Sequence, residues 1–231
     1  MPPKWGARTS SGVTARDLAL RMYERRLPLA LGALAVVSAA LGWWGDHTWR
    51  TSQEEAAQVL MTKALTGLEA SLKGTEGGKA SEASSGRLEE AQTILLQIRK
   101  EYSSSKAAEQ ALLQLGNIFY QKADHEKALQ AYQEYLEQYP GGSWVILAGV
   151  GKGYTLEAQG RYEDAAAIFR TLGERYKDSS LSIEALLGLA RSLSHRDRGP
   201  EAVELYRRIA DEYAGTSWGR RAEELMGVGE R

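Results

Sequence analysis

The chain has 231 residues, of which 43% are hydrophobic and 26% are charged, a balance typical of a folded protein. It contains no cysteine, which excludes disulfides, zinc-thiolate sites and thiol nucleophiles. Residues 1–45 carry six Lys or Arg against two Asp or Glu, so with a net charge of -1 the remainder is mildly acidic. A nucleic-acid binder would carry its basic surface on the folded part, and we therefore expect no nucleic-acid partner.

An uncharged stretch from Leu27 to Gly45 is dominated by Leu, Ala and Val and predicts a single transmembrane anchor over residues 27–45. As a helix, Leu27 to Trp44 would measure roughly 27 Å, close to the thickness of the hydrocarbon core of a bilayer. Tryptophans, which prefer membrane interfaces, cluster at the far end: Trp43, Trp44 and Trp49. The arginines that precede the stretch predict a basic cytoplasmic N-terminus over residues 1–26, with the rest of the chain on the other side of the membrane.

Two other interpretations of this stretch stay open. A cleavable signal peptide needs a cleavage site of small residues, and Val37-Ser38-Ala39 could serve as one. A buried core helix is the second interpretation. Apolar residues on every face of the stretch favour a membrane helix over a core helix, because a core helix of a globular domain shows an amphipathic stripe.

The remainder of the chain repeats with a period of 37 residues. One register holds only alanine: Ala91, Ala128, Ala165 and Ala202. A second register holds only tyrosine: Tyr102, Tyr139, Tyr176 and Tyr213. Two more hold large apolar or aromatic residues: Leu95, Tyr132, Phe169 and Tyr206, then Ile98, Tyr135, Leu172 and Ile209. Because apolar positions within a unit recur at intervals of three and four, each unit predicts a pair of amphipathic helices that packs small residues against large ones.

The first helices of these pairs are predicted over residues 106–122, 144–159 and 181–195. Breaker-rich segments at 140–143, 177–180 and 214–217 join the units, and their Ser and Thr residues predict helix N-caps. A helix near 218–226 is expected to cap the last repeat.

The N-terminal pair departs from the frame, because residues 74–86 are rich in Gly, Ser and Lys and predict a flexible loop. Its first helix is therefore predicted over 46–73, proximal to the membrane, and the repeat domain over 87–231. The predicted apolar face of this helix comprises Ala56, Val59, Leu60, Ala64, Leu65, Leu68 and Leu72.

No residue pattern points to catalysis. His47, His125 and His195 lack a second metal ligand at helical spacing, and we expect them at the surface or in turns. Gly149-x-Gly151-x-Gly153 lacks the strand and the Gly-Lys that flank a phosphate loop, and predicts close helix packing. We expect no enzyme activity, cofactor, metal or small-molecule substrate. The alternative is an enzyme accessory or hydrolase with a hidden site.

The inner face built by the first helices is the predicted binding surface, because these positions are not needed for packing within a pair. The residues predicted to bind a partner are Asn117, Tyr120, Tyr154, Glu157, Arg191 and Ser194. Asn117, Tyr154 and Arg191 are 37 residues apart and predict a ladder along this face. The same face is predicted to include the apolar side chains of Leu113, Leu147, Val150 and Leu187 and the carboxylate of Glu184. Such a lining suits an extended peptide or a helix.

These residues resemble the tetratricopeptide repeat. The positions that carry the resemblance are Leu112, Leu115, Gly116, Phe119, Ala128, Tyr132 and Pro140, followed by Gly153, Ala165 and Phe169. The resemblance implies an all-α chain: a single N-terminal transmembrane helix, a right-handed α-solenoid of about four helix pairs, and a C-terminal capping helix. The long period and the closing tyrosines look like repeats of bacterial envelope proteins in the Tol-Pal and outer-membrane assembly systems.

The order of the parts is similar to the YfgM family, ancillary subunits of the bacterial SecYEG translocon. A basic N-terminus, one span ending in tryptophans, the sequence AAQVLMTKAL at 56–65 and a few repeats carry this resemblance. It implies a single-pass inner-membrane scaffold with a periplasmic repeat domain that meets translocon subunits, periplasmic chaperones and exported chains. The alternative is an envelope-organising adaptor of the Tol-Pal, cell-division or outer-membrane assembly type.

Overall fold

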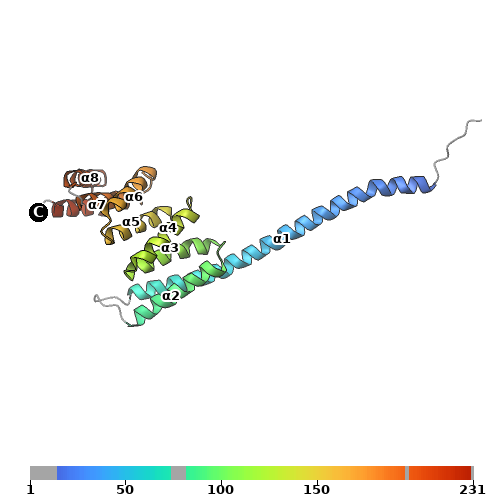
Figure 1. The fold of residues 1–231 in the computed structure, drawn as a ribbon, viewed down its shortest axis with the longest axis horizontal. Helices are drawn as coiled ribbons and strands as arrows, with labels where there is room; N and C mark the ends of the chain where they lie inside the picture. Colours follow the sequence, from blue (N-terminus) through green and yellow to red (C-terminus); the bar gives the residue numbers. More distant parts are fainter. Residues whose placement is uncertain (1–14, 74–81, 196–197, 230–231) are drawn as a thin grey trace, which may run out of the picture. The chain divides into compact units, whose positions relative to one another are not determined.

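The computed structural model describes residues 15–73, 82–195 and 198–229. The chain divides into two compact units, Met1–Ser52 and Gln53–Arg231. Within the described residues all regular secondary structure is α-helical, which confirms the predicted all-α class (Figure 1). The described helices are α1 Ala15–Lys73, α2 Glu82–Glu101, α3 Lys106–Gln121, α4 His125–Gln138, α5 Val145–Ala158, α6 Tyr162–Arg175, α7 Ser182–Ser194, α8 Gly199–Glu212 and α9 Ser217–Gly229.

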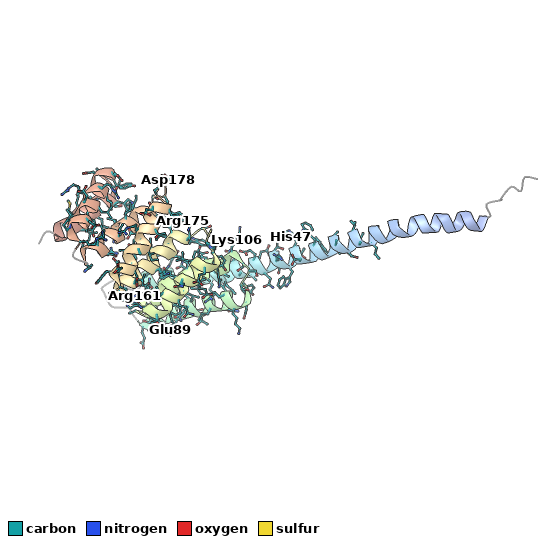
Figure 2. The ribbon with its side chains drawn as sticks, turned by 45° about the horizontal axis from the view of Figure 1, so that its top comes forward. His47, Glu89, Lys106, Arg161, Arg175 and Asp178 are labelled. Atoms are coloured by element: carbon teal, nitrogen blue, oxygen red, sulfur yellow. The ribbon has the colours of Figure 1, made fainter. Side chains whose placement is uncertain are left out.

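The described part of the first unit is a stretch of α1, a helix of 59 residues that continues into the second unit. The predicted anchor over 27–45 and the predicted helix over 46–73 are therefore one helix, with no break at residue 46. His47 is exposed on it, as predicted, and stacks on Trp43 with ring centroids 5.5 Å apart (Figure 2).

Large apolar side chains of α1 are exposed in the first unit: Leu34, Val36, Val37, Leu41, Trp43, Trp44 and Trp49. Among the described residues, no helix combines the length and the apolar character needed to cross a membrane. The side chains of residues 15–31 and 33 lie outside the described set, and they include part of the predicted span.

The second unit is built from helix pairs that follow one another in chain order (Figure 1). Each helix from α2 to α8 contacts the next helix, and first helices contact first helices, as α3 with α5, α5 with α7 and α7 with α9. This is the contact pattern of an α-solenoid, in which a repeat touches its neighbours in the chain. The predicted first helices match α3, α5 and α7 to within one residue at each end, and α9 is the predicted helix after the last repeat.

The last turns of α1 supply the first helix of the N-terminal pair. Ala57, Met61 and Ala64 are buried in one core with residues of α2 and α3. Lys63 forms an ion pair of 2.8 Å with Glu90 of α2. The predicted face was partly wrong, because Ala56, Val59 and Leu72 are exposed. The buried positions follow the 57, 61 and 64 stripe, which turns position 59 to the opposite side of the helix.

Helix α2 begins at Glu82, so the loop predicted over 74–86 is wrong for its last residues. Two features favour helix there despite the glycine and serines. Glu82 places a carboxylate in the first turn, where the helix dipole stabilises negative charge, and Ser84 is buried in the fold. Residues 74–81 lie outside the described residues.

Three of the four 37-residue registers lie in the core of the helix pairs, and the tyrosine register packs against it. All members of the alanine register and of the two large registers are buried. Glycines let the helices close around the aromatic rings: a Cβ atom on Gly116 would lie 2.6 Å from the Tyr132 ring, and one on Gly151 would lie 2.4 Å from it. Gly153 and Gly188 meet Phe169 in the same way. Each ring is therefore held between its own first helix and the next one.

The tyrosine register ends the second helices, as predicted. Tyr139, Tyr176 and Tyr213 are the C-cap residues of α4, α6 and α8, and each donates its backbone N–H to the carbonyl four residues earlier. Tyr102 makes the same bond to Ile98 after α2.

The predicted Ser and Thr N-caps are wrong for α5 and α7, whose caps are Trp144 and Leu181 without a side-chain hydrogen bond. Before α5 the turn is organised by Glu109 instead, which accepts hydrogen bonds from the Tyr135 hydroxyl at 2.6 Å and the Ser143 N–H at 3.0 Å. The Glu109 carboxylate thus fixes the turn that precedes α5, and it does so from a neighbouring helix. At the third segment the prediction holds, because the Thr216 hydroxyl accepts from the Gly219 N–H at 3.3 Å.

Candidate functional site: the first-helix pocket

Helices α3, α5, α7 and α9, together with the start of α6, line a pocket of about 440 Å³. We call it the first-helix pocket, and its residues are Tyr120, Tyr154, Glu157, Ala158, Tyr162, Glu184, Arg191, His195 and Arg221. Eight of the nine form four pairs that are 37 residues apart: Tyr120 and Glu157, Tyr154 and Arg191, Ala158 and His195, Glu184 and Arg221. The repeat therefore brings equivalent positions of neighbouring first helices to one wall.

An ion pair between α5 and α7 forms one side of the pocket. The Arg191 Nη2 atom lies 2.5 Å from Glu157 Oε2, and Arg191 Nε lies 3.2 Å from the same oxygen. The Ser192 hydroxyl donates to Glu157 Oε1 at 2.7 Å. The Glu157 carboxylate is thus held by two neighbours on α7, as a carboxylate with little solvent requires.

A second network links α5, α7 and α9. The Tyr154 hydroxyl donates to Glu184 Oε1. Arg221 Nη1 lies 3.3 Å from Glu184 Oε1 and 3.2 Å from Glu184 Oε2. Because Arg221 belongs to α9, the helix after the last repeat contributes directly to the pocket and does more than cover the core.

Aromatic rings complete the lining. The Tyr154 ring packs edge-on against Phe169, with ring centroids 5.6 Å apart. The Arg191 guanidinium carbon lies over the Tyr154 ring, 4.9 Å from its centroid. His195 stacks on Tyr162, with centroids 4.4 Å apart and planes 11° apart. Tyr154 is therefore held from two sides, and cation–π attraction adds to the ion pair that holds Arg191.

Four of the six predicted binding residues line the first-helix pocket: Tyr120, Tyr154, Glu157 and Arg191. Asn117 does not line it, because its Oδ1 accepts from the Tyr132 hydroxyl at 2.8 Å and its Nδ2 donates to Gln114. Of the three residues in the predicted ladder, Tyr154 and Arg191 touch within the pocket, and Asn117 lies outside its lining.

Ser194 also lies outside the pocket lining. Its hydroxyl donates to the Ala190 carbonyl at 3.0 Å and meets the hydroxyl of Tyr206. Burial raises the pKa of Tyr206, while Arg191 and Ser194 act in the opposite direction. Ser194 therefore contacts residues of its own helix pair, α7 and α8.

The prediction that Leu113, Val150 and Leu187 line the inner face is wrong, because all three are buried in the core clusters. This side of each first helix packs on the neighbouring pair, since the first helices contact one another.

Four pocket residues were not predicted from the sequence: Ala158, Tyr162, His195 and Arg221. The period carried a signal for two of them, because His195 follows Ala158 and Arg221 follows Glu184 by 37 residues. Tyr162 lies outside any first helix and had no such signal. His195 is the exposed C-cap residue of α7, which agrees with the predicted surface or turn position.

A second pocket of about 490 Å³ lies among α6, α7 and α8. Its apolar residues include Leu189 and Leu193, which are buried and offer a ligand little surface. Its charged residues alternate in sign: Arg170, Glu174, Lys177, Glu201, Arg208 and Glu212. The first-helix pocket combines exposed rings with fixed charges and is the better candidate for binding.

The described residues contain no group of three His, Asp or Glu side chains placed to hold a metal ion. In the first-helix pocket, both carboxylates already accept hydrogen bonds from protein groups. What this arrangement offers chemically is recognition by rings and guanidinium groups.

Two comparisons with known proteins bear on these features. A family model described as the tetratricopeptide repeat matches residues 81–143 and 150–216, which together make up more than half of the chain. A search of curated proteins found no match. The two matched ranges contain most of α2 to α8, and so the helices that carry eight of the nine pocket residues.

Proposed function

We propose that this chain, which belongs to the tetratricopeptide repeat family, is a non-catalytic scaffold that holds a segment of another protein in its first-helix pocket. The observation that carries the proposal is that four pairs of residues line a single pocket, and that the two members of each pair are one repeat apart. Tetratricopeptide repeats suggest protein–protein interaction in general, and aromatic and arginine side chains are the residues that most often anchor protein interfaces.

The scaffold is proposed to be tethered to a bacterial inner membrane by residues 27–45, with the repeat domain in the periplasm. Support comes from the uncharged stretch, the arginines before it and the tryptophans after it. The exposed apolar side chains of α1 in the first unit add to this support, because such patches mark contact with lipid or protein. The resemblance to the YfgM family then favours a translocon-associated or chaperone-like role for exported proteins.

Blocking the pocket tests the binding proposal. Ala158 is exposed at the end of α5 and lines the pocket, so Ala158→Trp should fill it without disturbing the core. Ala167 is exposed on α6 and lines none of the described pockets, which makes Ala167→Trp the matched control. With the full-length protein, binding of a chemically unfolded exported protein should fall about tenfold for Ala158→Trp alone. Equal binding by both variants would exclude the pocket.

Crosslinking in cells tests the partner class. A photoreactive residue at Glu55 or Glu69, both exposed on α1, should capture translocon subunits or periplasmic chaperones. Capture of Tol-Pal or peptidoglycan-synthesis components instead would support the envelope-organising adaptor.

Membrane topology is tested by cysteine labelling, which is clean because the chain has no native cysteine. In spheroplasts, a membrane-impermeant thiol reagent should label Lys100→Cys and leave Thr9→Cys unlabelled. The reverse pattern contradicts the orientation. Release of the protein from membranes by carbonate, with a mature N-terminus near residue 40, would favour a cleaved signal peptide.

A further inference from the structure

The two ion pairs of the first-helix pocket both present their cation outward. The Arg221 side chain is 46% exposed against 19% for Glu184, and Arg191 is 26% exposed against 11% for Glu157. In each pair the exposed fraction of the arginine side chain is more than twice that of the glutamate side chain. Although each pair is neutral, the arginine is therefore the partner that a ligand reaches more easily.

The unused hydrogen-bond donors of the two arginines also favour a ligand that accepts hydrogen bonds. A guanidinium group carries N–H donors on three nitrogens. Arg191 uses Nε and Nη2 on Glu157, and Arg221 uses Nη1 on Glu184. Among the described residues, no hydrogen bond is made by Arg191 Nη1 or by Nε and Nη2 of Arg221.

The carboxylates of these pairs have less free hydrogen-bonding capacity than the arginines. Glu157 Oε1 accepts from Ser192 and Arg191, and Glu184 Oε1 accepts from Tyr154 and Arg221. The first-helix pocket is thus left with unused donors on its exposed groups and with acceptors that are already engaged. Such a pocket favours an acceptor on the ligand.

We propose that the first-helix pocket selects an acidic side chain within the bound segment, held between Arg191 and Arg221. This inference rests on the proposed function. A carboxylate can accept charge-assisted hydrogen bonds from both guanidinium groups, whereas a lysine would meet two cations and engaged acceptors. The rings of Tyr120 and Tyr162 line the same pocket and provide apolar contact for the residues beside the acid.

The probe is a set of fluorescein-labelled nonapeptides blocked at both ends, with the fifth residue fixed as Glu, Gln or Lys. The other positions are drawn from Leu, Tyr, Ser and Asn. Binding to the full-length protein is measured by fluorescence anisotropy at about 0.05 M salt, where partly exposed charges are weakly screened. The Glu set should bind about tenfold more tightly than the Gln set, a difference of about 1.4 kcal/mol, and the Lys set should bind most weakly.

Arg221→Gln is the main variant, because Arg221 is nearly half exposed and Glu184 keeps its hydrogen bond from Tyr154 when the arginine is lost. This variant should reduce the preference for Glu over Gln to about twofold or less. Arg220→Gln is the control: it removes the same charge from the neighbouring position on α9, where Arg220 contacts the Gly215 carbonyl and lies outside the pocket lining. It should leave the preference unchanged. An unaltered melting temperature of Arg221→Gln shows that the fold is retained.

Three outcomes would overturn the inference. If Glu, Gln and Lys sets bind equally and Ala158→Trp still blocks them, the pocket binds segments without selecting an acid, and only the inference fails. If no set binds, or if Ala158→Trp leaves binding unchanged, the proposed function fails with it. If a Gln set with a free C-terminal carboxylate binds as tightly as the blocked Glu set, the pocket recognises chain ends and not side chains within a segment.

Discussion

The helix-pair core and the first-helix pocket follow the same 37-residue period, but residue type is kept along the period in the core and changes along it in the pocket. In the core, equivalent positions keep the same kind of residue, as in the alanine register Ala91, Ala128, Ala165 and Ala202, all of them buried. In the pocket, equivalent positions change in kind, so that Glu184 is followed by Arg221 and Tyr154 by Arg191.

This difference has a physical reason. Each helix pair must solve the same packing problem, because a small residue has to face a large one wherever two helices approach closely. Residues of the inner face carry no such constraint, and neighbouring repeats can place complementary groups side by side. The pocket is asymmetric for that reason. The first three predictions below each test one side of this contrast, and the fourth concerns a helix cap outside both regions.

The largest effect is expected for Ala165→Trp, because Ala165 is fully buried at the contact of a helix pair. Overpacking at this position should lower the free energy of unfolding by about 3 kcal/mol or more. Ala167→Trp, two residues further along α6 and exposed, should change it by less than about 0.5 kcal/mol. Urea denaturation followed by circular dichroism measures both, and similar losses would show that the alanine register is not the packing position.

Next in size is Gly153→Ala. Its added Cβ atom would lie 2.4 Å from the Phe169 ring. This ring is packed between α5 and α7 and cannot move away freely. We expect a loss of about 1 to 3 kcal/mol in the free energy of unfolding. Gly86→Ala in α2, where no atom lies within 4 Å of the new Cβ, should instead stabilise the protein by about 0.5 to 1 kcal/mol. Urea denaturation measures both variants. If the free energy of unfolding changed with the same sign in both, the tight packing of Phe169 between the two helices would be contradicted.

A smaller loss is expected for Arg191→Ala in the pocket. Glu157, 11% exposed, would keep only its hydrogen bond from Ser192, and the free energy of unfolding should fall by about 1 to 2 kcal/mol. Arg161, at the start of α6 (Figure 2), pairs with Asp164 where both side chains are about half exposed, and Arg161→Ala should cost about 0.5 kcal/mol or less. Equal losses would show that the pocket pair is no more than a surface contact.

The smallest effect concerns Asp124, the N-cap residue of α4, which lies outside both regions. A hydrogen bond from Lys127 lowers the pKa of Asp124 below 3.8. A carboxyl whose pKa is lowered on folding stabilises the protein above its unfolded pKa and loses this contribution as the pH falls through the folded value. The stability difference between the native protein and Asp124→Asn should therefore be present at pH 7 and shrink as the pH falls through the lowered pKa of Asp124. A difference that grows on acidification would have the wrong sign.

Much of the fold follows from the sequence, because packing imposes the period on residue type. The boundaries of α3, α5 and α7 are predicted to within one residue. The N-caps of α5 and α7 are not, since the acceptor before α5 is Glu109, a residue from another helix that local sequence does not indicate. The face of α1 is predicted only in part, because no repeated register extends to Val59.

The pocket is predicted less completely, for a related reason. Spacing found Tyr154 and Arg191, but it also placed Leu113, Val150 and Leu187 on the inner face, where they are buried instead. Spacing does not say which of these side chains pair with one another. The bond between Glu157 and Arg191 spans 34 residues and depends on how two neighbouring first helices are placed. Tyr162 enters the pocket from the start of a second helix, where the period predicts no binding residue.

The central claim is that segments of other proteins bind in the first-helix pocket, and crosslinking from within the pocket tests it most directly. A photoreactive phenylalanine derivative replaces Tyr162, which lines the pocket, or Ala167, which is exposed further along the same helix. With an unfolded exported protein as the client, position 162 should give a crosslinked product that an excess of the blocked Glu peptides removes, and position 167 should give little. Equal yields at both positions, or a product only at position 167, would contradict the account.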